Sequence, residues 1–191
     1  MDTPRQNSTK SKLRSYFKNE LKLQFEATKL QRACLAANQI LTLVESRKFR
    51  HVALFASDTY EIQTKPLFEC LLQRRVHTYF PRISNDMLEF LPVQSWSDLK
   101  PGKFNILAPY SGFACTPSTL ELIIVPGLVF DLKGFRLGRG KGYYDKFLPS
   151  LGPFSIRVGY AYDFQLVDHL PAEPHDQKMD FVVTESRTLT V

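Results

Sequence analysis

Apolar residues recur every three or four positions in the first quarter of the chain. They include Leu13, Phe17 and Leu21, and the same spacing continues to about residue 46. Because an α-helix completes a turn in about 3.6 residues, this spacing places the apolar side chains on one face. The pattern therefore predicts one or two amphipathic helices between residues 10 and 46.

Short apolar runs bounded by turn residues replace the helical spacing from residue 51 onward. Residues 51–57 and 76–81 predict buried strands, and Thr64 is predicted to cap a helix between them that ends near Arg75. A strand–helix–strand unit of this kind predicts a parallel sheet. Further strands are predicted at residues 120–125, 156–161 and 181–184, with a small β-hairpin insertion within residues 82–110.

These elements predict an α/β fold with an open, mostly parallel sheet and helices on both faces. We expect residues 10–191 to form a single domain and residues 1–9 to be a flexible N-terminus. Ligands of such sheets bind at the carboxyl ends of the strands. The loops that follow Ser57 and Val125 are therefore the candidate binding loops.

The charge of the chain is basic, with 25 Lys and Arg against 19 Asp and Glu and a formal net charge of +6. This balance favours anionic partners such as nucleic acids, nucleotides or phosphorylated metabolites. A generally basic surface without any partner explains it equally well. The basic runs are too short to be a nucleic-acid-binding tail, so we expect small-molecule substrates and no specific nucleic acid.

Cysteine spacing and hydropathy argue against two other classes. The three cysteines, Cys34, Cys70 and Cys115, form no CxxC pair, so neither a zinc ribbon nor a dithiol redox pair is supported. The apolar run at residues 122–130 is interrupted by proline and glycine and is too short to span a bilayer. No signal peptide is visible, and we expect a cytoplasmic protein with reduced thiols and no membrane partner.

A glycine-rich basic segment is the strongest candidate for chemistry. Gly138, Gly140 and Gly142 alternate with Arg139 and Lys141. Glycine lets backbone N–H groups approach phosphate oxygens, and the helix predicted to follow would add positive potential at its N-terminus. The segment therefore predicts a phosphate site.

The segment departs from two well-known phosphate motifs. Phe135 stands where a Walker A loop needs its first glycine, and Gly142 replaces the serine or threonine that follows the lysine. Tyr143 takes the last glycine position of a GxGxxG dinucleotide motif. A flexible basic turn is the alternative interpretation. Asp145, just beyond, supplies a hard oxygen ligand for Mg²⁺ next to the predicted phosphates.

Two runs of this segment resemble the signature of the 5-formyltetrahydrofolate cyclo-ligase family, also called methenyltetrahydrofolate synthetases. They are residues 126–131 (PGLVFD) and residues 136–148 (RLGRGKGYYDKFL). Further family-like features follow in the expected order over residues 10–185: Lys10 with Arg14, the EIQT run at 61–64, the YFPR run at 79–82, and Asp180 after Met179. One departure is Phe104, which begins the FNILAP stretch where the family often has tryptophan.

The resemblance implies a fold like that of the NagB/RpiA/CoA-transferase group and a set of site residues. ATP would be bound by Lys10, Arg14, Arg136, Leu137, Gly138, Arg139, Gly140, Lys141, Gly142, Tyr143 and Tyr144. The folate would be held by Glu61, Phe80, Phe104 and Tyr144, and Mg²⁺ by Asp145 and Asp180. The residues implied in catalysis are Lys141, Arg139 and Tyr144.

The implied reaction is the ATP-dependent conversion of 5-formyltetrahydrofolate to 5,10-methenyltetrahydrofolate, with release of ADP and phosphate, through a phosphorylated formyl group. A carboxylate at Glu61 suits a pterin, because it accepts from two N–H donors at once. Two alternatives stay open: a non-catalytic nucleotide-, folate- or RNA-binding module on the same domain, and a sugar-phosphate isomerase or CoA transferase, which would need no ATP. We expect a monomer.

Overall fold

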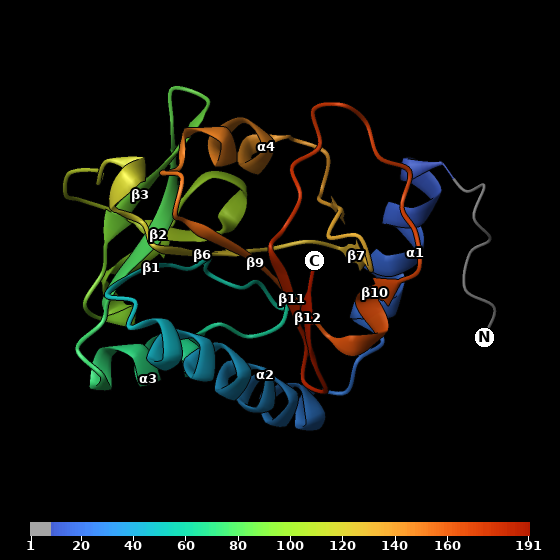
Figure 1. Ribbon diagram of the computed structural model, residues 1–191, viewed down its shortest axis with the longest axis horizontal. Coiled ribbons are helices and arrows are strands. Elements are labelled where there is room, and N and C mark those ends of the chain that lie inside the picture. Colours follow the sequence, from blue (N-terminus) through green and yellow to red (C-terminus); the bar gives the residue numbers. More distant parts are fainter. Residues whose placement is uncertain (1–8) are drawn as a thin grey trace.

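The computed structural model describes residues 9–191, and a seven-stranded sheet runs through its middle (Figure 1). The strand order is β12-β11-β9-β6-β1-β2-β3. These strands are β1 (His51–Ala53), β2 (His77–Ser84), β3 (Met87–Pro92), β6 (Leu122–Val125), β9 (Ile156–Tyr160), β11 (Phe181–Val183) and β12 (Thr188–Thr190). The five central strands are parallel, and only β12 and β3 at the two edges run antiparallel to their neighbours. The prediction of an open, mostly parallel sheet is confirmed.

Helices cover both faces of this sheet, as the sequence predicts. The helices α2 (Glu26–Arg47) and α3 (Lys65–Gln73) lie on one face, and α4 (Tyr143–Phe147) lies on the other (Figure 1). Successive side chains of a strand point to opposite faces, so β6 contributes to two cores. Leu122 and Ile124 pack in the core that includes α2 and α3, whereas Ile123 and Val125 pack in the core that includes Phe147. A strand buried on both faces therefore appears as an unbroken apolar run.

The N-terminal helices divide near residue 24 into α1 (Lys10–Lys22) and α2. Thr9 is the N-cap of α1, because its hydroxyl accepts a hydrogen bond from the Lys12 N–H at 3.5 Å. The rest of the segment predicted to be a flexible N-terminus lies outside the described residues. Leu13, Phe17 and Leu21 are buried along one face of α1, which confirms the amphipathic pattern. No helix within residues 9–191 is both long enough and apolar enough to cross a membrane.

The hairpin predicted within residues 82–110 is divided between two sheets. β3 pairs with β2 as the edge strand of the main sheet, and the turn at Asn85 and Asp86 has positive φ values of 48° and 57°. Two consecutive residues with positive φ are typical of a type I′ turn, whose backbone twist matches that of the two strands it joins. The remainder forms a separate ribbon of β4 (Leu99–Pro101) and β5 (Leu107–Pro109). Between these strands, Lys103–Asn105 forms a short 3₁₀ turn.

The segment after β6 was predicted as one glycine-rich loop, and this is wrong for its first half. β7 (Val129–Asp131) and β8 (Arg136–Leu137) form a hairpin, and β10 (Leu166–Val167) pairs beside β7. The buried Asp131 carboxylate accepts the N–H groups of Lys133 and Phe135, which forms the turn between β7 and β8. The glycine-rich loop proper therefore begins only at Gly138, directly after a strand.

Thr64 does not cap α3 in the way that its sequence position predicts. Its side chain makes no capping hydrogen bond, and its hydroxyl instead donates to the Phe55 carbonyl at 2.6 Å. The start of α3 is thereby tied to the end of β1. This tertiary contact replaces the local cap, because Thr64 is completely buried and needs a partner for its hydroxyl.

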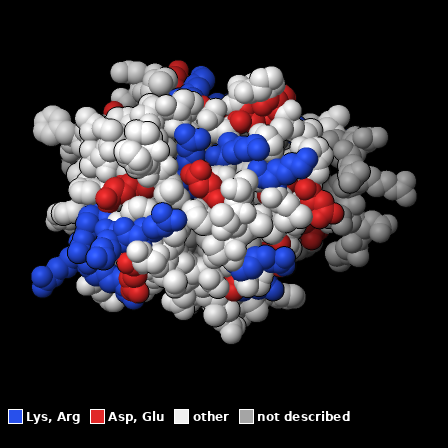
Figure 2. Space-filling view, in the orientation of Figure 1, with Lys and Arg blue, Asp and Glu red and all other residues white. Residues whose placement is uncertain are grey.

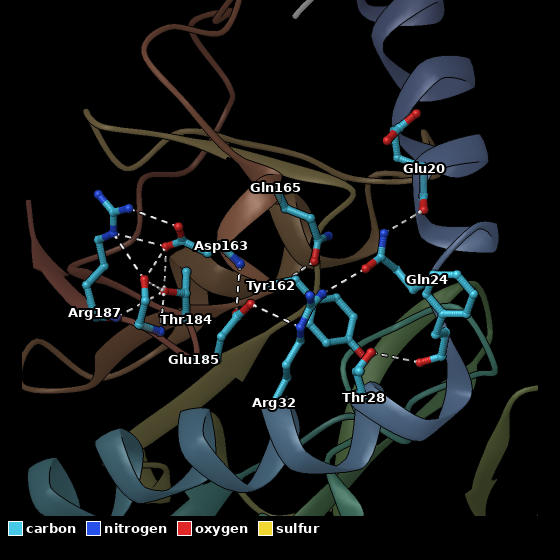
Figure 3. A network of polar contacts seen from close by, with 12 residues as sticks. Glu20, Gln24, Thr28, Arg32, Tyr162, Asp163, Gln165, Thr184, Glu185 and Arg187 are labelled. Carbon is cyan, nitrogen blue, oxygen red and sulfur yellow. Dashed lines mark hydrogen bonds and ion pairs between the residues drawn. The ribbon is translucent and has the colours of Figure 1, made fainter. Parts of the chain in front are cut away.

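A polar network joins α2 to the carboxyl ends of β9 and β11 (Figure 3). Asp163 binds the Arg187 guanidinium and also accepts from the Thr184 hydroxyl. Glu185 accepts the Asp163 N–H at 2.8 Å and lies 3.8 Å from Arg32 of α2. The network stabilises this part of the sheet edge, and its residues do not line the cavity described next.

Candidate functional site

A cavity of about 490 Å³ opens at the carboxyl ends of β1 and β6, where the two predicted binding loops meet. One wall is apolar and comes from the end of β1, the β2–β3 hairpin and the β4–β5 ribbon: Phe55, Ile83, Leu88, Ile106 and Leu107. The opposite wall is the glycine-rich segment from Arg136 to Asp145, and α1 and residues 173–176 complete the rim. The size suits a small-molecule ligand.

The glycine-rich loop is held against α1. Gly140 and Gly142 have positive φ values of 95° and 69°, a conformation that side chains other than glycine rarely adopt. The Arg14 Nε donates to the Gly138 carbonyl at 3.0 Å. A Cβ atom at Gly140 would lie 3.5 Å from the Arg14 guanidinium carbon. The predicted nucleotide residues of α1 and of the loop thus lie together, although more than 120 residues separate them in sequence.

Arg136 is buried beside Tyr144, a half-buried residue of α4. The Arg136 guanidinium donates to the Asp145 carboxylate at 2.8 Å and lies 5.6 Å from the centre of the Tyr144 ring. Burial lowers the pKa of Arg136, and the Asp145 charge opposes that shift. Burial also raises the pKa of Tyr144, and its hydroxyl has no hydrogen-bond partner among the described residues. Tyr144 also lines the cavity, and buried hydroxyl groups normally have a hydrogen-bond partner.

Glu61 belongs to the loop between β1 and α3, and its side chain is only 14% exposed. Burial raises its pKa to about 7; the Arg139 charge opposes this shift, and the Asp58 charge adds to it. Arg139 lies 2.9 Å from a Glu61 carboxylate oxygen and also pairs with Asp58. Glu61, which was predicted to bind the folate, is therefore in direct contact with Arg139, which was predicted to bind the nucleotide.

Lys10 pairs with two acids at the cavity rim, Asp176 at 2.7 Å and Glu173 at 3.0 Å. Burial alone would lower the pKa of Lys10, but these two carboxylates raise it. The pKa of Asp176 is lowered in turn, since the bonds from Lys10 and from the Glu173 N–H outweigh its own burial. All three residues line the cavity.

The structure places Asp180, predicted as a metal ligand, away from the cavity lining. Its carboxylate accepts the Arg157 N–H at 2.7 Å, beside the first residues of β9. The cavity lies at the opposite, carboxyl ends of the parallel strands, and Asp180 does not line it. Asp176, four residues earlier, lines the cavity together with Asp145.

The structure also places Phe80, predicted to bind the folate, in the core and not on the cavity wall. Its ring is completely buried and packs edge-on against Phe68 and Trp96, in the core on the α3 face of the sheet. Its neighbour Pro81 and Ile83 line the cavity instead. Alternation along the strand explains the difference, because adjacent residues of β2 face opposite sides.

Phe104 and Lys141 meet at the mouth of the cavity. Phe104 is half exposed in the left-handed backbone region, with φ of 60°. The Lys141 Nζ lies 5.8 Å from the centre of its ring, and the Tyr143 ring lies 6.5 Å away. Leu137, also predicted as a nucleotide residue, is a buried β8 residue whose atoms reach the cavity wall.

Three acidic residues near the cavity were not predicted as site residues. Glu173 and Asp176 belong to an irregular segment that carries no motif, so no sequence signal marks them. Asp58 is marked by a sequence signal, because it forms with Glu61 the D-x-x-E spacing of a reciprocal capping pair. The structure shows this pairing, since each of the two residues accepts the backbone N–H of the other.

The parallel sheet and a cavity at the carboxyl ends of its strands define the chain as an α/β protein with a candidate small-molecule site. Within that class, the model of the 5-formyltetrahydrofolate cyclo-ligase family matches residues 6–185, and the chain belongs to this family.

Comparisons with individual proteins agree with the family match. The chain is 27% identical to the 5-formyltetrahydrofolate cyclo-ligase of Mus musculus, over 94% of this chain and 95% of that protein. It is 34% identical to the enzyme of the same name from Escherichia coli K12, over 80% and 87%. The solved structure of Aquifex aeolicus 5,10-methenyltetrahydrofolate synthetase superposes with a TM-score of 0.85 at 31% identity, covering 95% of this chain and 92% of that one.

Proposed function

We propose that this protein converts 5-formyltetrahydrofolate to 5,10-methenyltetrahydrofolate with consumption of ATP. One observation carries the proposal. A single cavity is lined by a glycine-rich cationic loop, by the largely buried Glu61 carboxylate and by an apolar wall. Such a cavity brings a polyphosphate and a flat heterocycle together. Transfer of a phosphoryl group from ATP to the folate requires this proximity.

The nucleotide would lie along the glycine-rich loop. Arg14 and Arg136 bring positive charge from α1 and β8, and Lys141 stands exposed at the rim. The backbone N–H groups near Gly140 and Gly142 are open to phosphate oxygens, because no Cβ shields them. Lys10 and Arg136 pair with carboxylates in the structure. A bound triphosphate would exchange those partners for phosphate oxygens.

The folate would lie with its pterin ring between Glu61 and the apolar wall. The Glu61 carboxylate accepts N–H donors, and Phe104 offers a half-exposed ring at the mouth for stacking. Ile83 and Leu88 of the β2–β3 hairpin supply the apolar contacts that Phe80 was predicted to supply. The Tyr144 hydroxyl, buried without a partner among the described residues, would donate a hydrogen bond to the formyl oxygen.

The chemistry follows from the poor reactivity of a formamide. Its oxygen attacks the γ-phosphorus and the bond to the β-phosphate oxygen breaks, which releases ADP and leaves the formyl oxygen phosphorylated, with the formyl carbon still bonded to N5. N10 of the folate then attacks the activated carbon and loses its proton, and the C–O bond breaks with loss of phosphate. Arg139 and Lys141 would stabilise charge on the transferring group, so the reaction needs positioned cations rather than a nucleophilic side chain.

The donor set on the cavity wall also fits Mg²⁺. Asp145 and Asp176 both line the cavity, whereas no group of three or more His, Cys, Asp or Glu residues within the described range could hold a metal by itself. Mg²⁺ is commonly held by one or two carboxylates together with substrate phosphates. We propose that Asp145 and Asp176 would hold it. When bound, the ion would supply charge neutralisation at the phosphates.

A direct assay tests this function. The purified protein is mixed with 5-formyltetrahydrofolate, ATP and Mg²⁺, and methenyltetrahydrofolate is followed by its absorbance. We expect product only when ATP is present, with one ADP formed per product. Equal product without ATP, or no product with all components, would contradict the proposal, and the second result would favour the binding-module alternative.

Three expectations accompany the proposed function. The cysteines are free in the described structure, which suits a reducing cytoplasm, and we propose this location. A monomeric state and the lack of a specific nucleic-acid partner stay predictions.

A further inference from the structure

Asp58 joins the two loops that form the cavity without lining the cavity itself. Its Oδ1 accepts the N–H groups of Tyr60 at 2.9 Å and Glu61 at 3.0 Å, and its Oδ2 accepts from the Arg139 guanidinium. The same terminal nitrogen of Arg139 lies 2.9 Å from Glu61. One side chain therefore forms the turn that carries Glu61 and also binds the cation of the glycine-rich loop.

The turn at residues 58–61 is fixed from a second side. The buried Lys29 of α2 donates to the Thr59 carbonyl at 2.9 Å and pairs with Glu26 at 2.6 Å. Glu61 in turn accepts the Asp58 N–H at 3.1 Å. Since α2 and the reciprocal Asp58–Glu61 bonds hold this turn, its carboxylates form a rigid anchor against the glycine-rich loop.

Arg139 needs such an anchor. Its side chain is 43% exposed and extends from a loop whose glycines allow many backbone conformations. The contacts that hold its guanidinium in the structure are those to Asp58 and Glu61. In the proposed reaction Glu61 must also bind the pterin, so Asp58 is the partner that can stay with Arg139 throughout turnover.

We infer that Asp58 is a positioning residue that acts through Arg139, holding its guanidinium where the transferring phosphate meets the folate. This inference rests on the proposed function. It predicts two separable roles for one side chain: the Oδ1 atom shapes the Glu61 turn, and the charge on Oδ2 holds Arg139.

Two substitutions separate these roles. Asp58→Asn keeps an oxygen that accepts the two backbone N–H groups but loses the charge that holds Arg139. We expect it to lower kcat/KM for ATP about tenfold, because a misplaced catalytic cation costs on this order, while folate affinity stays within about twofold. Asp58→Ala loses both interactions, so we expect folate affinity to fall as well.

A double-mutant cycle tests whether Asp58 acts through Arg139. ATP-analogue and folate affinities are measured by calorimetry, and kcat/KM by the absorbance assay, for Asp58→Asn, Arg139→Gln and the double variant. If Asp58 acts through Arg139, adding Asp58→Asn to Arg139→Gln should change kcat/KM for ATP by less than about twofold. Asp163→Asn is the matched control, because Asp163 binds Arg187 in the same manner outside the cavity. It should lower the melting temperature and leave the constants unchanged.

The outcomes distinguish this inference from the proposed function. If the wild-type protein forms no product, the proposed function itself fails. If the wild type is active and Asp58→Asn matches it in kcat/KM, or if the two substitutions have independent effects, Asp58 is not a positioning residue for Arg139. A loss in the single variant that disappears in the Arg139→Gln background supports the inference.

Discussion

At the scale of single residues, Glu61 combines burial with a place on the cavity wall. Its side chain lines the cavity, and burial raises its pKa to about 7. A group with this pKa titrates near neutral pH, whereas an exposed glutamate is ionised throughout that range. Both the binding of folate and the stability of the protein should therefore depend on pH through this residue.

Folate affinity should fall as the pH drops through about 7. Only the ionised Glu61 accepts two N–H donors, so below its pKa the affinity should fall about tenfold per pH unit. Calorimetry with 5-formyltetrahydrofolate from about pH 5.5 to about pH 8.5, roughly 1.5 pH units on either side of that pKa, measures the folate affinity. In Glu61→Gln, the pH dependence should disappear and affinity above pH 7 should be about 10- to 150-fold weaker, because a charge-assisted hydrogen bond contributes about 1.5–3 kcal/mol. An unchanged affinity in this variant would remove Glu61 from the folate site.

The stability of the ligand-free protein should show the opposite trend with pH. Between the ordinary pKa of 4.5 and the folded value of about 7, the folded state holds a proton on Glu61 that the unfolded state has lost. Stability from this residue is therefore present below that window and is lost as the pH rises through it. Chemical unfolding from pH 4.5 to 7.5, a range set by these two values, should show a weaker decline in Glu61→Gln than in the wild type. Equal slopes in the two proteins would contradict the burial argument.

A substitution of Lys141 tests whether the glycine-rich loop takes part in catalysis or only binds ATP. Lys141→Met keeps the apolar stem and removes the ammonium, so the fold should survive while the cation–π contact with Phe104 is lost. If its charge acts mainly on the transferring phosphate, turnover should fall roughly 100- to 1,000-fold, with a smaller loss of ATP affinity. Single-turnover rates and calorimetry measure both quantities.

Lys146 offers a control for that substitution. It is an exposed lysine on α4 that does not line the cavity. Lys146→Met should stay within about threefold of the wild type in rate. If Lys141→Met is equally mild, Lys141 is not a catalytic residue.

At the scale of elements, α1 carries two residues that we propose to bind the nucleotide, on a face that must stay docked. Lys10 and Arg14 reach the cavity, and Leu13, Phe17 and Leu21 of the same helix are buried. Docking of a helix depends on its buried side chains, since an isolated helix of this length is only marginally stable in water. The site at this end therefore depends on core residues that touch no ligand.

Phe17→Ala tests the dependence of nucleotide binding on the docking of α1. The ring is 1% exposed, so its removal should lower the free energy of unfolding by about 3–5 kcal/mol. ATP affinity should fall at temperatures where the protein remains folded, while folate affinity changes less. Denaturant unfolding and calorimetry measure these effects. The exposed Lys18→Ala should change stability by less than about 0.5 kcal/mol, and equal ATP affinity in both variants would contradict the argument.

At the scale of the whole molecule, the net charge of +6 raises the question of nucleic-acid binding. On the face shown in Figure 2, basic and acidic side chains lie side by side. We therefore expect only weak RNA binding that is independent of sequence and falls steeply as salt is raised. Fluorescence anisotropy with several unrelated RNAs over a salt series checks this. Tight, sequence-selective binding at physiological salt would favour the binding-module alternative.

Much of the fold follows from the sequence because its patterns are local. The run at Leu122–Val125 predicted a buried strand, since all four residues are apolar and a parallel strand is covered on both faces. The glycine-rich loop was equally clear, because the backbone freedom of Gly140 and Gly142 is a property of the residues themselves. The hairpin of β7 and β8 was missed, because its strands are short and its turn depends on a buried aspartate.

The details of the site depended on contacts between distant segments. Sequence alone did not distinguish the two faces of β2, and only packing against Phe68 placed Phe80 in the core. The pairing of Lys10 with Asp176, across 166 positions, decided which acid lines the cavity and left Asp180 beside Arg157. Propensity, periodicity and glycine content act within a few residues and are visible in the sequence. The direction of a side chain depends on what packs against it, and only the tertiary structure decides that.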